Sequence, residues 1–331
     1  MVRCIRVPKA EGNPVRVRLK NEGLLNCDFR IASDGDHLLI PLLTDSFEGY
    51  ECIDWDLEPI IHEETDYRMF LPEDIRDILP NSYDCIGDVI VVKIIDELMD
   101  YRHQIGEALL KVNKNFRLVL MDGGVKGELR IRDLEPIAGE GDSETRHKES
   151  GVIMITDPAK VYFNPRLATE RMRIASLVKD GETIIDMFAG VAPFPLVISK
   201  HAKPKLIYSI DLNYDAVEYM IRNIHLNKVK NIVPIEGDAS VEIQNIPMAD
   251  RVIMNLPQIA YRFLGDALSR TKQGGTVHMH RIMERDSVES DMSQLIEEVK
   301  GKGFDCHVSE IRELKTYSPS ASVYVVDIIR D

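Results

Sequence analysis

The stretch DMFAGVAPFPLVISK, residues 186–200, decides the fold of the C-terminal half of this chain. An acidic residue closes an apolar run, a turn that contains glycine follows, and a hydrophobic helix begins after the turn. A strand, a turn and a helix in this order can hold a nucleotide at the carboxyl end of the strand. The stretch therefore predicts a nucleotide-binding α/β domain and leaves open which nucleotide is bound.

Expected strands and helices alternate on both sides of this stretch. The strands are expected in VIMIT, TIIDMF, KLIYSIDL, NIVPIEGD, ADRVIMNLP, GGTVHMH and SVYVVDII, and the helices in NYDAVEYMIRNIHLNK, AYRFLGDALSRT and SQLIEEVKGKG. Strands separated by helices of about 10–15 residues are typical of a doubly wound, mostly parallel sheet. In such a sheet the ligand lies beyond the carboxyl ends of the strands.

Polar residues stand where a nucleotide bound at those strand ends would lie. Asp186, Asp211 and Asp238 each follow one of three successive strands, and Asn255 follows the fourth. An acidic residue after the second strand can accept hydrogen bonds from two ribose hydroxyls. One after the third strand can approach an adenine amino group. A single aspartate of this kind is more often a helix cap, but three in succession favour a nucleoside cofactor.

The turn indicates which cofactor to expect. AGVAPF has proline and phenylalanine where the dinucleotide fingerprint GxGxxG has glycines. S-adenosylmethionine has no phosphate, and an acidic residue near the turn can face its positively charged methionine end. Gly190 lets the backbone come close to a ligand. The turn therefore favours S-adenosylmethionine over a dinucleotide.

The N-terminal half has a different pattern. Residues 1–60 alternate apolar and polar positions in VRVRL and HLLIPLL, which predicts a small β-rich domain. The acidic stretch EPIIHEETDYR, about 58–68, is expected to be a linker. A middle α+β domain is expected over 66–150. Its first half should contain a short helix in LPEDIRDILP, a turn entering a strand in YDCIGDVIVVKI, and a helix over 98–112. Its second half should contain a strand in RLVLMD, a turn in GGVKGELRIRDL and a polar loop over 138–150. Residues 151–331 form the third predicted domain.

The charge is unevenly distributed. The net charge of −14 argues against a nucleic-acid partner at first sight, but residues 31–100 alone carry −16. A polyanion can still bind the rest of the chain, because local potential steers binding more than the total charge does. The first 30 residues are basic: they hold seven cationic side chains, among them Arg3, Arg6, Lys9, Arg16, Arg18 and Lys20.

The cysteines and the apolar runs bear on location. The five cysteines are far apart with no CxxC pair, which disfavours a zinc site or a disulfide framework and favours reduced thiols in a cytoplasm. No apolar run reaches the length needed to cross a bilayer, and the N-terminus lacks the apolar core of a signal peptide. We expect a cytoplasmic protein with no membrane partner and no metal.

Several motifs together resemble one family. DMFAGVAPF, SIDLN, GDA, VIMNLP and VYFNPRLATERMRI are similar to the archaeal and eukaryotic tRNA (guanine-N1) methyltransferases, which act on the guanosine 3′ of the anticodon, tRNA position 37. YDCIGDVIVVKI, YRHQIGEALLK and LKTYSPSASVYVVDI extend the resemblance over most of the chain. The resemblance implies a class I (Rossmann-like) S-adenosylmethionine-dependent methyltransferase domain, preceded by a small tRNA-docking domain and an RNA-contacting domain. It also implies a monomer without an obligate protein partner.

The expected reaction needs three groups. The N1–H of guanine is weakly acidic, so the site needs a base for that proton, a donor aimed at O6, and a group that holds the base edge. Arg166 and Glu170 in NPRLATER are four residues apart, on one face if the segment is helical. The spacing alone favours an ordinary surface ion pair, but the resemblance makes Glu170 the general base and Arg166 a catalytic partner.

Further site residues follow from the same motifs. Asn255 offers an amide that suits a guanine edge, and Pro257 would stiffen the turn after it. Tyr162 would stack on the base or lie along the cofactor. The cofactor residues are expected to be Asp186, Phe188, Gly190, Asp211, Leu212, Asp238, Ala239 and Asn255, and the substrate residues Tyr162, Arg171 and Pro257.

Two departures from the family pattern leave alternatives open. The family commonly has H-R-E-N-G, whose arginine is thought to stabilise charge at O6, whereas RHKESG has Lys148 at that place. Lysine keeps the charge but loses the planar fork, so either Arg166 or Arg146 would take part or the substrate geometry would differ. Ala192 stands where glycine is common. A wyosine-pathway enzyme that transfers methyl or aminocarboxypropyl to the tricyclic base at position 37, alone or besides guanosine methylation, stays open, as does an idle RNA-binding protein.

Overall fold

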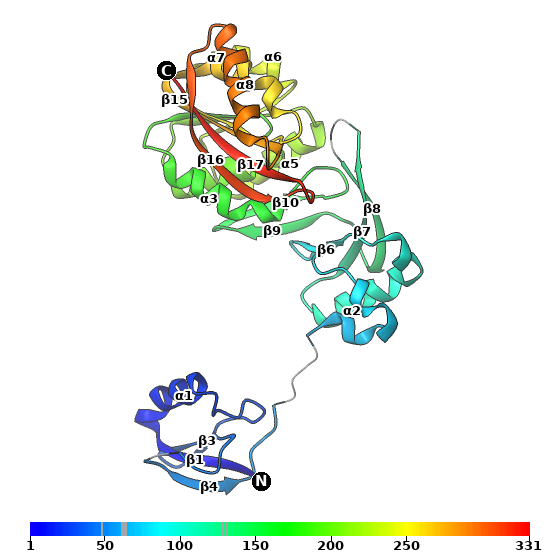
Figure 1. Cartoon of the computed structure of the whole chain (residues 1–331), viewed down its shortest axis with the longest axis vertical. Helices are drawn as coiled ribbons and strands as arrows, with labels where there is room; N and C mark the ends of the chain where they lie inside the picture. Colours follow the sequence, from blue (N-terminus) through cyan, green and yellow to red (C-terminus); the bar gives the residue numbers. More distant parts are fainter. Residues whose placement is uncertain (48, 61–64, 128, 130) are drawn as a thin grey trace. The chain divides into compact units, whose positions relative to one another are not determined.

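The computed structural model describes residues 1–47, 49–60, 65–127, 129 and 131–331, and it separates into two compact units, Met1–Asp66 and Tyr67–Asp331 (Figure 1). Part of the expected linker at 58–68 and part of the expected turn in GGVKGELRIRDL lie outside the described residues. The three predicted domains at 1–60, 66–150 and 151–331 stay a prediction.

The first unit is a small α/β structure. Its four-stranded antiparallel sheet has the order β2-β3-β1-β4, from strands β1 Val2–Pro8, β2 Ala32–Asp34, β3 His37–Pro41 and β4 Glu51–Trp55. The prediction of a strand in VRVRL was wrong, because these residues lie in helix α1, Gly12–Asn21, after the short η1, Lys9–Glu11. Val15 and Leu19 are buried while Val17 between them is exposed, so the buried positions repeat every four residues.

The middle segment, at the start of the second unit, is an α+β layer. Its sheet has the order β5-β6-β7-β8 from β5 Asp84–Ile86, β6 Val89–Val92, β7 Leu118–Lys126 and β8 Ile131–Gly139, packed on helix α2, Arg102–Val112, and the short η2 Tyr67–Phe70, η3 Glu73–Ile78 and η4 Asp96–Tyr101. The expected turn in GGVKGELRIRDL was wrong over most of its length. Its residues form the arms of the β7–β8 hairpin, and Gly123 and Gly124 lie at a register shift between the two strands rather than at the reversal.

The expected loop over 138–150 was also wrong in its second half. Thr145–Glu149 form β9, which pairs antiparallel with β10, Val152–Thr156. Ser150 and Gly151 between them both have positive φ, the backbone that a tight two-residue hairpin turn requires. The buried face of β9 carries Thr145 and Glu149 rather than apolar residues, so no hydrophobic alternation marks the strand.

The third segment forms the seven-stranded sheet, in the order β13-β12-β11-β14-β15-β17-β16. Its strands are β11 Thr183–Asp186, β12 Leu206–Asp211, β13 Ile232–Glu236, β14 Ala249–Met254, β15 Thr271–Glu284, β16 Cys306–Thr316 and β17 Ala321–Arg330. The strands β11 to β15 are parallel and β17 runs antiparallel between β15 and β16, which confirms the mostly parallel sheet. VIMIT is a strand, but it pairs with β9 and not in this sheet.

Helices cover both faces of the seven-stranded sheet. On one face, a hydrophobic core includes helices α3 Ala168–Leu177, α4 Pro193–His201 and α5 Tyr214–Leu226. On the opposite face, a second core includes α6 Ala239–Glu242, α7 Leu264–Arg270 and α8 Val288–Gly301. The short helices η5 Pro165–Leu167, η6 Ile243–Asn245 and η7 Ala260–Phe263 adjoin these helices. The first core also contains Ile86, Val89 and Leu118 of the middle segment, so the middle and third segments share one core. Among the described residues, no helix has the length and apolar character to cross a membrane.

Candidate active site

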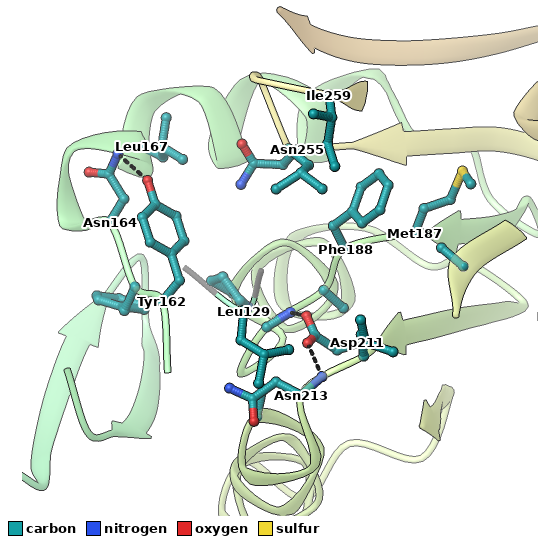
Figure 2. A pocket seen from close by; sticks show the side chains of 18 of the residues that line it. Leu129, Tyr162, Asn164, Leu167, Met187, Phe188, Asp211, Asn213, Asn255 and Ile259 are labelled. Carbon is teal, nitrogen blue, oxygen red and sulfur yellow. Dashed lines mark hydrogen bonds between the residues drawn. The ribbon is translucent and has the colours of Figure 1, made fainter. Parts of the chain in front are cut away.

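A cavity of about 310 Å³ lies at the carboxyl ends of the parallel strands, and we call it the strand-end cavity (Figure 2). It lies over the turn after β11 and the ends of β12 and β14, as a doubly wound sheet predicts. Nine of the predicted site residues line it: Tyr162, Arg171, Phe188, Gly190, Asp211, Leu212, Asp238, Ala239 and Asn255.

Asp211 links two backbone segments that line this cavity. Its Oδ2 accepts a hydrogen bond from the Gly190 amide at 2.7 Å, and its Oδ1 accepts one from the Asn213 amide at 2.9 Å. Burial raises the pKa of the Asp211 carboxyl above its ordinary value. Each carboxylate oxygen has a second lone-pair direction, so Asp211 keeps acceptor capacity toward the cavity.

Gly190 is required for the shape of the turn rather than for space. Its φ is +55°, a conformation that residues with a side chain adopt at a cost. A Cβ added there would meet Tyr162 O at 3.6 Å, an ordinary contact. The glycine therefore permits the left-handed turn that aims its amide at Asp211.

Asp186 and Asp238 differ in their environment. Asp186 is buried beneath the cavity and is absent from its described lining, and Phe188 N approaches its Oδ1 at 3.4 Å. Burial raises the pKa of Asp186 to about 8. Asp238 is both a cap and a lining residue: its Oδ1 accepts hydrogen bonds from the amide and the hydroxyl of Ser240 at 2.8 and 2.6 Å, and these bonds lower its pKa.

A second cavity of about 190 Å³, which we call the adjoining cavity, shares one wall with the first. Four residues line both: Tyr162, Asn164, Leu167 and Asn255 (Figure 2). The Pro257 carbonyl accepts a hydrogen bond from the Ile282 amide at 2.9 Å, which fixes the loop after Asn255 beside β15. The other lining residues are Asp122, Val125, Arg132, Gln258, His280, Leu314, Lys315, Tyr317 and Val323.

Glu170 lies close to this wall but in neither described lining. Its side chain is fully buried, Arg173 Nη2 donates to its Oε1 at 2.9 Å, and Arg312 donates to its Oε2. Burial alone would raise the pKa of Glu170, but the hydrogen bonds from Arg173 and Arg312 bring it below its ordinary value. The carboxyl is therefore ionised at neutral pH.

The expected Arg166–Glu170 alignment on one helical face is not formed. Arg166 lies in η5, ahead of the first residue of α3, and its Nε donates to Asp84 Oδ1 of β5 at 2.7 Å. Lys148 lies on β9 opposite Ile153. Both residues are absent from the described linings of the two cavities.

Arg171 connects β9 to the shared wall. Its guanidinium is buried, donates to Glu149 Oε2 at 2.5 Å and to the Asn164 carbonyl at 2.7 Å, and faces the Phe163 ring. This side chain therefore positions the backbone of NPRLATER. Its partner Glu149 directly follows Lys148, within a segment that the sequence predicted as a loop.

His280, Arg132 and Lys315 line the adjoining cavity and were not predicted from the sequence. Lys315 is part of a motif quoted for the resemblance, yet nothing in that motif singled it out. His280 belongs to VHMH, which reads as an ordinary strand. Arg132 is held by Asp84 at 3.0 Å, 48 residues away in the sequence, and by Asp122 at 3.4 Å, on the other strand of the β7–β8 hairpin.

Three models of known protein families match successive parts of the chain. Residues 4–51 match the tRNA methyltransferase 5 N-terminal domain, residues 68–143 the TYW2 N-terminal domain, and residues 145–309 the TRM5/TYW2 methyltransferase domain. The tRNA (guanine(37)-N(1))-methyltransferase Trm5b of Pyrococcus abyssi is 39% identical, over 99% of this chain and 98% of the relative.

Solved structures agree with these matches. The complex of aTrm5 and tRNALeu is 34% identical and superposes with a TM-score of 0.76, covering 99% of both chains. The structure of Methanocaldococcus jannaschii TYW2 in complex with AdoMet is 27% identical, with a TM-score of 0.58, and covers 76% of this chain and 100% of that one.

Proposed function

Because the chain belongs to the TRM5/TYW2 methyltransferase family, we propose that it methylates N1 of guanosine 37 in tRNA with S-adenosylmethionine as methyl donor. The observation that carries the proposal is the wall of Tyr162, Asn164, Leu167 and Asn255 between two cavities. One cavity has the place and lining of a nucleoside cofactor site. The other is open to a base whose edge would meet the cofactor at Asn255.

The strand-end cavity suits S-adenosylmethionine by its donor set. Asp211 keeps acceptor capacity for ribose hydroxyls, and Asp238 stands at the next strand end, where an adenine amino group would lie. Phe188, packed edge-on against Phe263 with ring centroids 5.3 Å apart, offers an apolar surface for the adenine ring. When bound there, S-adenosylmethionine supplies an electrophilic methyl group.

The adjoining cavity would receive the target base. Asn255 presents an amide, which can donate and accept along a guanine edge. Tyr162 offers a ring for stacking, and Pro257 holds the loop through its bond to β15. A guanosine in an anticodon loop reaches such a cavity at smaller cost than a duplex base, because fewer stacking and pairing contacts are lost.

We assign the general base to Glu170. The carboxylate is ionised and stands in the first turn of α3, three residues after the wall residue Leu167. Arg173 and Arg312 stabilise the ionised form, so proton uptake requires that one of them withdraw; Arg312, with a third of its side chain exposed, is the freer one. Arg166 and Lys148 stay predicted contributors to charge stabilisation.

The wyosine pathway supplies the second candidate function. Residues 68–143 match the TYW2 N-terminal domain, and a TYW2 structure covers most of this chain. The chain would then act on the tricyclic base at position 37 instead of, or besides, guanosine.

One experiment separates the two candidates. The purified chain is incubated with S-adenosylmethionine and a tRNA transcript carrying guanosine 37, and in parallel with tRNA carrying the wyosine precursor. The nucleosides are then identified by mass spectrometry. We expect 1-methylguanosine from the transcript. No product from the transcript, together with a modified precursor, would transfer the assignment to the wyosine pathway.

The proposal extends to location and assembly. The five cysteines are free, which agrees with a reducing cytoplasm. We propose a cytoplasmic monomer that meets tRNA there.

A further inference from the structure

His280 is a buried polar side chain that the reaction scheme above does not use. It lies on β15, is completely buried and lines the adjoining cavity together with Asn255 and Pro257. Its ring packs edge-on against Phe194 with centroids 5.9 Å apart. Neither ring nitrogen has a hydrogen-bond partner among the described residues.

Such a pair of orphaned nitrogens is unusual. Nearly all buried polar groups in folded proteins are hydrogen-bonded, and an exception calls for a functional reason or a missing partner. The backbone of Met254 faces the ring outside hydrogen-bond geometry. Because His280 lines the adjoining cavity, a ligand bound there can supply the missing partner.

The ring is neutral in this environment. Burial lowers the pKa of His280 to about 4, and the charges of His278 and Arg173 act in the same direction. The Glu170 carboxylate and the Met254 backbone favour the protonated ring but do not outweigh burial. A neutral imidazole has one N–H donor and one acceptor, and such a ring can polarise a carbonyl without carrying charge itself.

The cationic groups first expected near O6 are placed elsewhere. Lys148 is on β9, and Arg166 is paired with Asp84. Arg132, which does line the adjoining cavity, is held by two carboxylates. None of the cationic residues predicted to act at O6, which are Lys148, Arg166 and Arg146, is in the described lining of either cavity.

We propose that His280 donates its ring N–H to O6 of the target guanine and thereby stabilises the charge that develops there. This inference rests on the proposed function. As methylation proceeds, the N1–H bond breaks and its proton passes to Glu170, while N1 forms a bond to the methyl carbon. That carbon's bond to sulfur breaks, and the sulfur keeps the electron pair. The His280 proton stays on the ring throughout.

The test compares three proteins on two substrates. Wild type, His280→Phe and His280→Gln are measured in single turnovers on transcripts with guanosine or 6-thioguanosine at position 37. Sulfur accepts hydrogen bonds poorly, and its other effects on the base are common to all three proteins. His307→Phe is the control, since His307 is exposed and pairs with Asp331 away from both cavities.

We expect His280→Phe to slow methylation of the guanosine transcript by about 10²- to 10³-fold, the usual effect of removing one oxyanion donor. Glutamine keeps an N–H donor, so His280→Gln should recover at least about tenfold of that loss. On the 6-thioguanosine transcript the ratio of wild type to His280→Phe should fall below about tenfold, because wild type makes only a weak hydrogen bond to sulfur and the variant therefore loses little.

Three results would overturn the inference: a His280→Phe rate within threefold of wild type, an equal ratio on both transcripts, or His280→Gln as slow as His280→Phe. The last would indicate a proton acceptor instead of a donor. Cofactor binding and thermal melting establish that each variant is folded, and His280→Gln carries the test if the phenylalanine variant is not. If wild type does not methylate the guanosine transcript, the proposed function is refuted together with the role of His280. If wild type is active and the His280 variants are equally active, only the role of His280 is refuted.

Discussion

The Gly190 amide donates to Asp211 Oδ2 at 2.7 Å, so the turn after β11 is fixed to the end of β12. The bond sets the shape of the strand-end cavity before any ligand enters. The bond also couples the conformation of the turn to the position of the Asp211 carboxylate. Two pairs of variants can measure the contribution of each to cofactor binding.

Gly190→Ala should weaken both the fold and cofactor binding. A positive φ at a residue with a Cβ costs about 1–2 kcal/mol, and relief of that strain would turn the amide away from Asp211. Gly181, which also has a positive φ and open space around it, is the matched control. Gly181→Ala should lower the free energy of unfolding by a similar amount and leave the dissociation constant for S-adenosylmethionine unchanged. Equal effects of both variants on cofactor binding would refute the role of the turn.

Asp211→Ala should weaken S-adenosylmethionine binding by about 10- to 100-fold, the value of a hydrogen bond to a charged group. Isothermal titration calorimetry measures this directly. Asp215, in the first turn of α5 and outside the described linings, provides the control Asp215→Ala. Unchanged affinity in the Asp211 variant would exclude Asp211 from the cofactor site.

Because of Asp186, we expect the free energy of unfolding to depend on pH. Its folded pKa of about 8 lies above the ordinary value near 4, so between these pH values the folded chain holds a proton that the unfolded chain has lost. The contribution of this group to stability is therefore present at low pH and declines as pH rises toward 8. Asp186→Asn should stabilise the chain at pH 8 by at least about 1 kcal/mol relative to wild type. Urea unfolding at pH 5 and pH 8 checks whether the difference grows with pH, and a constant difference would contradict the assignment.

Glu170→Gln should slow the chemical step while cofactor affinity stays within about twofold, because Glu170 is outside the strand-end lining. A loss of about 10²-fold or more is usual for a general base. Glu182→Gln is the control: Glu182 is another poorly exposed carboxylate paired with an arginine, Arg251, away from the cavities. Single-turnover rates equal to wild type would remove Glu170 from the base role.

Removal of residues 1–66 should raise the dissociation constant for tRNA and spare that for S-adenosylmethionine, because this compact unit ends at Asp66. The effect should be moderate, since Arg3, Arg6 and Arg18 are each paired with an acidic side chain within the unit. Filter binding at several salt concentrations measures it, and a smaller salt dependence after truncation is expected. Identical tRNA affinity would leave the unit without a docking role.

The sequence predicted the catalytic sheet well, because its strands are apolar runs that end in Asp186, Asp211, Asp238 and Asn255. It failed where polar residues make a strand. Strand β9 buries Thr145 and Glu149, and β16 lies at the sheet edge with only Cys306 buried, so neither shows an apolar pattern. The prediction of a strand in VRVRL was wrong for another reason. Val15 and Leu19 lie on one face in a strand and in a helix alike, and only the exposure of Val17 in the structure distinguishes the two.

The site divides in the same manner. Strand-end residues were predictable because the topology gathers the carboxyl ends of parallel strands at one edge. The partners of Glu170 were not, because Arg312 lies 142 residues away and only the folded β16 brings it there. His280 was not predicted as a site residue, because a histidine within an apolar strand belongs to no recognisable motif.

The shared core of the middle and third segments limits how such chains can be recombined. Ile86, Val89 and Leu118 pack in the same cluster as Met154 and Phe194, so a cut between 150 and 151 would expose apolar surface on both fragments. A cut at Asp66 exposes no part of that cluster. Chimeras that exchange the first 66 residues between relatives should therefore fold, whereas exchange of the middle segment alone requires that the facing core residues be exchanged with it.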